Sequence, residues 1–181
     1  MNIEPRLGID FGRVIQGGAQ APGGADTAFL GGSLEEALAS PATDGAFDVL
    51  PDLIGLAGGR AWIISKAGDR VRARTLAWLD HHDFYRRTGL PRGNVRFCRK
   101  RSEKAVHCRE LGITHMIDDR LDVHRALRGT VPHLYLFGPQ REAVPGWVRH
   151  VPTWTDARTI GDALSAGTGA GRTPSATRRS R

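Results

Sequence analysis

Acidic, hydroxyl and amine side chains stand at the ends of several short apolar runs in this sequence. Asp10 ends the run RLGID, Ser65 and Lys66 end AWIISK, and the pair Asp118-Asp119 ends THMIDD. Carboxylates are the ligands that hard divalent cations prefer, and they can also act as nucleophiles. A hydroxyl or an amine can donate hydrogen bonds to the oxygens of an anion. These residue types are suited to metal-assisted chemistry on an anionic substrate if the fold brings them together.

The elements that must position these residues follow from the apolar pattern. Five runs have the length and boundaries of buried strands, at residues 6–10, 61–65, 94–98, 114–118 and 133–137. Helix-like stretches lie between and after them, at residues 33–40, 47–57, 69–84, 103–111, 121–127 and 155–164. This alternation predicts an α/β fold, a three-layer Rossmann-like parallel sheet of about five strands with helices on both faces. Ligands of such sheets bind beyond the carboxyl ends of the strands, where these polar residues stand.

The order and context of these residues resemble the haloacid-dehalogenase-like superfamily of hydrolases and phosphatases. Its first motif, a strand running into Asp-x-Asp, matches LGIDFGRVI at residues 7–15, and its second, a strand ending in Ser or Thr, matches WIIS at residues 62–65. The single lysine ahead of the last motif is matched by Lys104, with Lys100 as the alternative. The fourth motif is matched by MIDDRLD at residues 116–122, in a form similar to that of the nucleotidase branch. The resemblance covers about residues 6–137.

The resemblance implies an Mg²⁺-dependent hydrolase, a phosphatase that works through an aspartyl-phosphate at Asp10. Ser65 would donate a hydrogen bond to a phosphoryl oxygen, and Lys104 would hold Asp10 ionised and screen the phosphate charge. The implied metal ligands are Asp10, the Gly12 carbonyl, Asp118 and Asp119, with Asp122 at or near the metal. The implied substrate-binding residues are Gly12, Arg13, Ser65 and Lys66.

The sequence departs from the family pattern at two positions. Gly12 stands where phosphatases of the family carry a second Asp, which protonates the leaving oxygen and activates water, and such help is worth ~10²–10⁴ in rate. Relatives without this Asp act on phosphonates, carbon–halogen bonds or acyl phosphates. Arg13 replaces a small or uncharged residue, and it would either contact an anionic substrate or point to solvent. The candidate replacement acids are His81, His82 and Asp69, and Gly8 and Gly12 would let backbone N–H groups approach an anion.

The segments where family members carry a cap domain are short here. Residues 16–46 and 66–93 leave no room for a large cap, so we expect an open site. In the family an open site implies a macromolecular phosphate as substrate, or closure by a partner subunit such as a second copy in a homodimer; a phosphorylated small molecule remains the other substrate class. The Gly-rich residues 16–32 are expected to form a flexible loop, which either orders on substrate binding or stays a surface loop.

Composition and charge set the remaining expectations. The 181 residues carry a net charge of +7, of which residues 166–181 supply +4, so we expect a core domain at 1–165 and a disordered basic tail at 166–181. Cys98 and Cys108 read as buried hydrophobes. Without a signal peptide or an apolar span, we expect a cytoplasmic protein with no membrane partner. Two alternatives stay open: a binding or regulatory module that turns nothing over, and a nucleic-acid end-processing phosphatase that uses the basic tail.

Overall fold

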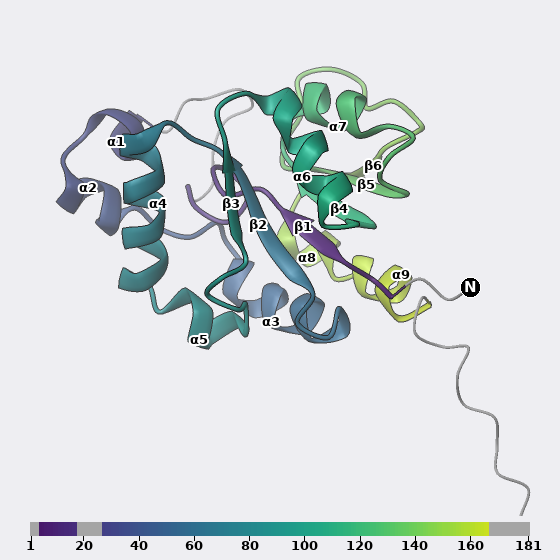
Figure 1. Ribbon diagram of the computed structural model, residues 1–181, viewed down its shortest axis with the longest axis horizontal. Helices are drawn as coiled ribbons and strands as arrows, with labels where there is room; N and C mark the ends of the chain where they lie inside the picture. Colours follow the sequence, from purple (N-terminus) through teal and green to yellow (C-terminus); the bar gives the residue numbers. More distant parts are fainter. Residues whose placement is uncertain (1–3, 18–26, 167–181) are drawn as a thin grey trace, which may run out of the picture.

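The computed structural model describes residues 4–17 and 27–166, and it confirms an α/β fold built on a parallel sheet (Figure 1). The sheet order is β3-β2-β1-β4-β5-β6, with every neighbouring pair parallel. The strands are β1 (Leu7–Ile9), β2 (Ala61–Lys66), β3 (Val95–Cys98), β4 (His115–Asp118), β5 (His133–Phe137) and β6 (Arg149–Val151).

Helices cover both faces of the sheet and divide the core in two. The α-helices are α1 (Thr27–Gly31), α2 (Leu34–Ala39), α3 (Ala46–Leu56), α4 (Asp69–His81), α5 (Phe84–Thr88), α6 (Lys104–Glu110), α7 (Leu121–Leu127), α8 (Trp154–Ala157) and α9 (Ile160–Ala166), and one 3₁₀ turn, η1 (Arg101–Glu103), precedes α6. Alternate strand residues such as Ile9 and Ile63 pack with α3, α4, α5, α8 and α9. Their neighbours Ile64 and Met116 face α6 and α7. This division follows from the two-residue period of strands buried on both faces.

The strand order reverses at the middle of the sheet, which determines where a site can form. The chain moves from β1 outward to β2 and β3, then crosses back to β4 and continues outward to β5 and β6. The boundary between β1 and β4 is therefore the switch point, where a crevice opens beyond the carboxyl ends of the strands. Asp10 follows β1, and Asp118 ends β4.

The structure differs from the sequence-based expectations in three elements. The described residues form six strands rather than about five, because β6 is a three-residue edge strand with two exposed residues and no apolar run to reveal it. The helix expected over 69–84 is two helices, because Asp83 adopts a left-handed backbone (φ 54°). The helix expected over 155–164 is also two, α8 and α9, and begins at Trp154. The capping box of Ser33 and Glu36 on α2 is confirmed.

No large cap domain interrupts the described part of the chain. Of the expected loop at 16–32, residues 18–26 lie outside the described residues, and Thr27–Gly31 forms α1. The expected tail also lies outside them, apart from its first residue, Ala166, which ends α9. Within the described residues, none of the helices has the length and apolar character needed to cross a bilayer.

Candidate active site

The loop after β1 holds Asp10 in place through a tight backbone turn. The N–H of Asp10 donates to the Ile117 carbonyl (2.9 Å), and the N–H groups of Ile15 and Gln16 both donate to the Phe11 carbonyl. The Phe11 ring is buried against Phe29 and Trp78, with ring centroids 5.6 and 5.3 Å away. Apolar packing thus fixes the residue next to the carboxylate, so that Asp10 lies at the rim of the sheet and is only 8% exposed.

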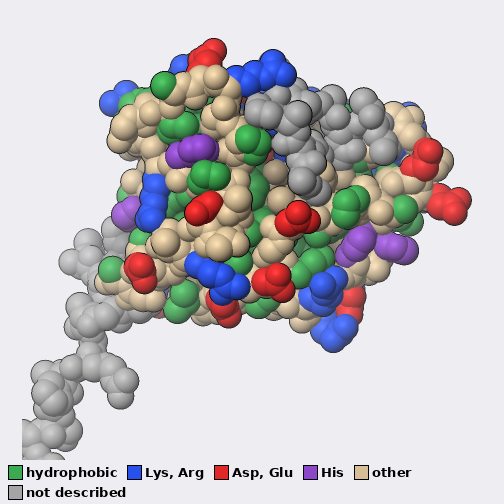
Figure 2. Space-filling view, turned by 180° about the vertical axis from the view of Figure 1, so that it is seen from behind, with side chains coloured by type: hydrophobic (Ala, Val, Ile, Leu, Met, Phe, Trp, Pro, Cys, Tyr) green, Lys and Arg blue, Asp and Glu red, His purple; other side chains and the backbone are tan. Residues whose placement is uncertain are grey.

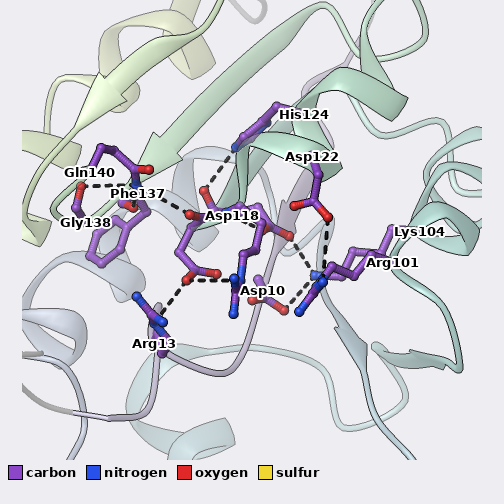
Figure 3. Close-up of polar contacts among 12 residues, drawn as sticks. Asp10, Arg13, Arg101, Lys104, Asp118, Asp122, His124, Phe137, Gly138 and Gln140 are labelled. Carbon is purple, nitrogen blue, oxygen red and sulfur yellow. Dashed lines mark hydrogen bonds and ion pairs between the residues drawn. The ribbon is translucent and has the colours of Figure 1, made fainter. Parts of the chain in front are cut away.

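Lys104, the first residue of α6, joins the ends of β1 and β4. Its Nζ lies 2.7 Å from Asp10 Oδ1 and 2.6 Å from Asp118 Oδ2, as Figure 3 shows. Burial disfavours the charged amine, but the two carboxylates outweigh that effect and raise the pKa of Lys104 above its usual value. Lys104 therefore stays charged, and of the two candidate lysines it is the one that meets the carboxylates.

Asp118 is fully buried, and both of its carboxylate oxygens are engaged. Oδ2 accepts from Lys104, and Oδ1 accepts from the backbone N–H of Arg120 (2.9 Å). Its carbonyl lies 3.0 Å from Nε2 of His124, a buried residue of α7 whose pKa burial lowers to about 4. The neutral imidazole therefore donates Nε2–H to that carbonyl and fixes the turn between β4 and α7. The sequence analysis did not single out His124, because nothing in its local pattern marks it.

Asp119 pairs with the residue that departs from the family pattern. Arg13 Nε lies 3.1 Å from Asp119 Oδ2, and Arg120 Nε lies 3.8 Å from the same oxygen. Arg13 has a left-handed backbone (φ 65°), and its side chain is only 15% exposed. The side chain thus does not point to solvent; it contacts an acid of the protein itself and lines the cavity described below, so contact with an anionic substrate stays a prediction. Gln140, which the sequence analysis did not single out, donates to the carbonyls of Phe137 (3.0 Å) and Asp119 (3.4 Å).

The three acids form one cluster. Asp10, Asp118 and Asp119 each offer a carboxylate oxygen within 4.8 Å of the others. Burial, offset in part by Lys104, raises the pKa of Asp10 to about 6, and burial together with Asp10 and Asp118 raises the pKa of Asp119 to about 7. Crowded carboxylates with raised pKa values are stabilised in their charged form by a divalent cation. The all-oxygen donor set fits a hard ion such as Mg²⁺.

A cavity of about 220 Å³ opens over this cluster. Asp10, Gly12, Ser65 and Asp119 line it, and Phe29 and Leu30 of α1 close one side. Ser65 is buried near the end of β2, where it pairs in register with Phe97 of β3. The structure therefore brings the predicted hydroxyl, amine and carboxylates to one crevice.

Two residues expected at or near the site make other contacts. Asp122 is outside the carboxylate cluster, because the first turn of α7 directs its half-exposed side chain toward Arg101 (3.7 Å) (Figure 3). Gly8 meets packed side chains rather than an anion, since a Cβ there would lie 2.6 Å from Met116 Sδ. Its role is close packing between β1 and β4.

The three candidate replacement acids are also absent from the described lining of the cavity. Asp69 is exposed and pairs with Arg99 (2.7 Å). His82 Nε2 lies 2.9 Å from the Leu38 carbonyl, and its partial burial lowers its pKa; His81 is exposed beside it. Cys98 and Cys108 are buried free thiols, as expected, and burial raises the pKa of both, to about 12 for Cys108.

Comparison with known proteins identifies the fold. A scan of protein-family models and a search of curated proteins gave no match to the sequence. Among solved structures, a haloacid dehalogenase-like family hydrolase from Xanthomonas campestris is similar, with a TM-score of 0.61 and 11% identity over 93% of this chain and 99% of that one. At this identity the likeness concerns the fold alone.

Proposed function

Because the chain has the fold of haloacid-dehalogenase-like hydrolases, we propose that it is an Mg²⁺-dependent hydrolase that transfers a phosphoryl group to Asp10. One observation carries this proposal: Lys104 bridges Asp10 and Asp118 at the switch point, with Asp119 beside them. A nucleophilic carboxylate and a phosphate repel each other, so the site must supply positive charge between them. Lys104 supplies part of it.

The metal would be held by Asp10, Asp118 and Asp119 together with the Gly12 carbonyl. When bound, Mg²⁺ would offset the charge that builds up on the transferring phosphoryl group. No described backbone N–H donates to the Gly12 carbonyl, so that oxygen is available as a ligand. Asp118 already accepts two hydrogen bonds from the protein, which leaves Asp10 and Asp119 as the carboxylates best able to turn an oxygen toward the ion.

The chain's own residues act as nucleophile, bind the substrate and position the acids. Asp10 is the nucleophile, and Lys104 keeps it ionised against the effect of burial. Ser65, which also lines the cavity, donates to a phosphoryl oxygen, and the exposed Lys66 attracts the anion. His124 and Gln140 position the backbone that carries Asp118 and Asp119, through the hydrogen bonds to their carbonyls.

The missing acid at Gly12 restricts which bonds can break. Without a group to protonate the leaving oxygen, an alkyl phosphate should react slowly, whereas a leaving group that is stable as an anion should not. A Cβ at Gly12 would meet no atom within 4 Å, so an Asp can be accommodated there. Gly12→Asp should therefore raise the hydrolysis of glycerol phosphate ~10-fold or more and change that of acetyl phosphate far less.

The test is hydrolysis of acetyl phosphate and p-nitrophenyl phosphate with and without Mg²⁺. We expect metal-dependent release of phosphate, loss of activity in Asp10→Asn, and a phosphorylated Asp10 in acid-quenched protein analysed by mass spectrometry. A metal-dependent activity that persists in Asp10→Asn would contradict the nucleophile. No turnover of these substrates or of a phosphoanhydride by the wild-type protein would contradict the hydrolase.

The second candidate is a binding module that holds metal and an anion without turnover. It is favoured by Gly12 and by the absence of the three candidate acids from the described cavity lining. In that case Mg²⁺ and phosphate together should raise the melting temperature while no substrate is consumed.

A further inference from the structure

The cavity over Asp10 is more basic than one phosphate requires. Its described lining contains five cationic side chains and two acidic ones, and three of the cations, which we call the rim cations, are exposed or partly exposed: Lys66, Arg101 and Arg120. Lys104 is committed to Asp10 and Asp118, and Arg13 to Asp119. Lys66 forms no ion pair with any other described residue. Positive charge therefore remains at the rim after the catalytic cluster has been compensated.

The basic character continues from the rim along one edge of the sheet. Residues 66–104, which run from the last residue of β2 through α4, α5, β3 and η1 to the first residue of α6, contain twelve Lys or Arg and four Asp or Glu, a net +8. Residues 1–65 and 105–165 together carry −5. On the face seen from behind, acidic and basic side chains are interspersed and neither gathers into a patch (Figure 2). The described molecule thus concentrates its positive charge beside β3, the edge strand next to the cavity.

Arg101 and Lys66 connect the cavity with this basic edge. Lys66 ends β2, and Arg101 begins η1 directly after Arg99 and Lys100, all of them exposed. The ion pairs here are long or exposed: Arg101 lies 3.7 Å from Asp122, and Arg99 pairs with Asp69 at the surface. Exposed pairs contribute little, so these cations can turn to an anionic ligand at small cost.

We propose that the substrate is a phosphoanhydride, a phosphoryl group bonded to a further phosphate that occupies the basic rim. This inference rests on the proposed function and names its substrate class. Two independent features point to it: a leaving phosphate needs no protonation by the missing acid at position 12, and its extra negative charge matches Lys66, Arg101 and Arg120. An acyl phosphate would satisfy the first feature but place no second phosphate beside Lys66, Arg101 and Arg120, of which Lys66 has no ion pair with any other described residue.

The reaction balances with water as the only co-reactant. An Asp10 carboxylate oxygen bonds to the terminal phosphorus, the P–O bond to the bridging oxygen breaks, and its electron pair leaves on the departing phosphate. Water then attacks the phosphorus of the aspartyl-phosphate, and the P–O bond to Asp10 breaks. The hydroxyl of the water stays on the released orthophosphate, its other proton passes to solvent or product, and Asp10 is regenerated.

The experiment compares pyrophosphate, tripolyphosphate and ATP with acetyl phosphate and glycerol phosphate, using the full chain and Mg²⁺. We expect kcat/KM for at least one anhydride to exceed that for acetyl phosphate ten-fold or more. Preference for tripolyphosphate would identify an inorganic chain as the natural form, and preference for ATP a nucleotide. If acetyl phosphate is hydrolysed and every anhydride is slower, the anhydride inference is overturned while the proposed function stands.

Charge variants test the rim separately. The double variant Lys66→Ala/Arg101→Ala should lower kcat/KM for tripolyphosphate at least ten-fold more than for acetyl phosphate, mainly through KM. The matched control is Arg125→Ala, an exposed arginine of α7 that lines no part of this cavity and should change both substrates less than two-fold. Equal losses for both substrates in the double variant would overturn the assignment of the second phosphate to the rim.

Discussion

Both ends of the sheet bury titratable groups, but the carboxyl end buries an ion pair and the amino end buries a neutral histidine. At the carboxyl end, Lys104 and Asp118 are buried as ions, held together at 2.6 Å. At the amino end, His115 of β4 is 4% exposed and stacks on His133 of β5, with ring centroids 4.3 Å apart. Burial, reinforced by His133, lowers the pKa of His115 to about 4, so this ring is neutral.

The difference lies in the partners rather than in the depth of burial. Asp10, Asp118 and Lys104 compensate one another, whereas His115 has Thr114 Oγ1 at 2.7 Å from Nδ1 and no described partner for Nε2. A buried group keeps its charge only where opposite charge reaches it. The carboxyl end is therefore built for ionic chemistry, and the amino end is a neutral support.

The largest expected effect on stability comes from removing Lys104, the cation shared by the buried carboxylates. Lys104→Met leaves Asp10 and Asp118 buried without their shared partner, and we expect it to lower the free energy of unfolding by about 3 kcal/mol. Urea denaturation at pH 8 measures this loss. The loss should shrink at pH 5, where Asp10, whose pKa burial already raises to about 6, takes up a proton.

The matched control for that variant lies on the same helix. Arg109→Met removes an exposed cation of α6 with no described side-chain partner and should change stability by less than about 0.5 kcal/mol. If Lys104→Met is as mild as this control, the carboxyl end does not depend on an ionic core.

The second prediction concerns the ion pair of Arg13 and Asp119, which competes with metal binding. Arg13 already offsets the charge of Asp119, so a divalent ion must compete with its guanidinium for that carboxylate. Arg13→Ala should lower the Mg²⁺ dissociation constant about five-fold, equivalent to about 1 kcal/mol of removed competition. Isothermal titration calorimetry with Asp119→Asn as reference measures it. Weaker Mg²⁺ binding in Arg13→Ala would show that the arginine supports the ion instead.

The third prediction concerns His115 at the amino end of the sheet and the change of its contribution to stability with pH. Since the folded-state pKa of His115 lies below its unfolded value of 6.5, the unfolded chain binds the proton between pH 6.5 and about 4, and this residue destabilises the fold as pH falls through that range. His115→Phe should remove that loss, gaining about 0.8 kcal/mol relative to wild type between pH 7.5 and pH 6. A stability difference that is constant over this range would mean that the pKa of His115 is the same in the folded and the unfolded protein.

The candidate site at the carboxyl end of the sheet could be predicted from the sequence because its residues stand at the ends of strands. A parallel sheet brings Asp10, Ser65 and Asp118 to one edge regardless of their side-chain contacts, so the topology alone was enough to predict where the site lies. The pairing of Arg13 with Asp119 could not be predicted in this way, since it depends on a left-handed backbone at Arg13. The break at Asp83 escaped prediction for the same reason.

Other features depended on tertiary contacts. The edge strand β6 forms because Leu136 and Phe137 of β5 offer it a parallel partner, while its own residues, RHV, show too little apolar alternation to predict a strand. His124 reads as an ordinary helix residue until the turn after β4 brings its ring to the Asp118 carbonyl. Local sequence patterns do not contain such contacts.

The smallest expected effect separates an acid that belongs to the cluster from one that is only near it in sequence. Asp122 lies four residues after Asp118, yet its carboxylate is half exposed and 3.7 Å from Arg101. Exposed pairs of this kind contribute about 0–1 kcal/mol, so Asp122→Asn should change stability by less than about 0.5 kcal/mol and the Mg²⁺ dissociation constant by less than about two-fold. Asp119→Asn, measured beside it by calorimetry, should weaken Mg²⁺ binding at least ten-fold. If the two variants weaken binding equally, the ion is held further toward α7 than the carboxylate cluster indicates.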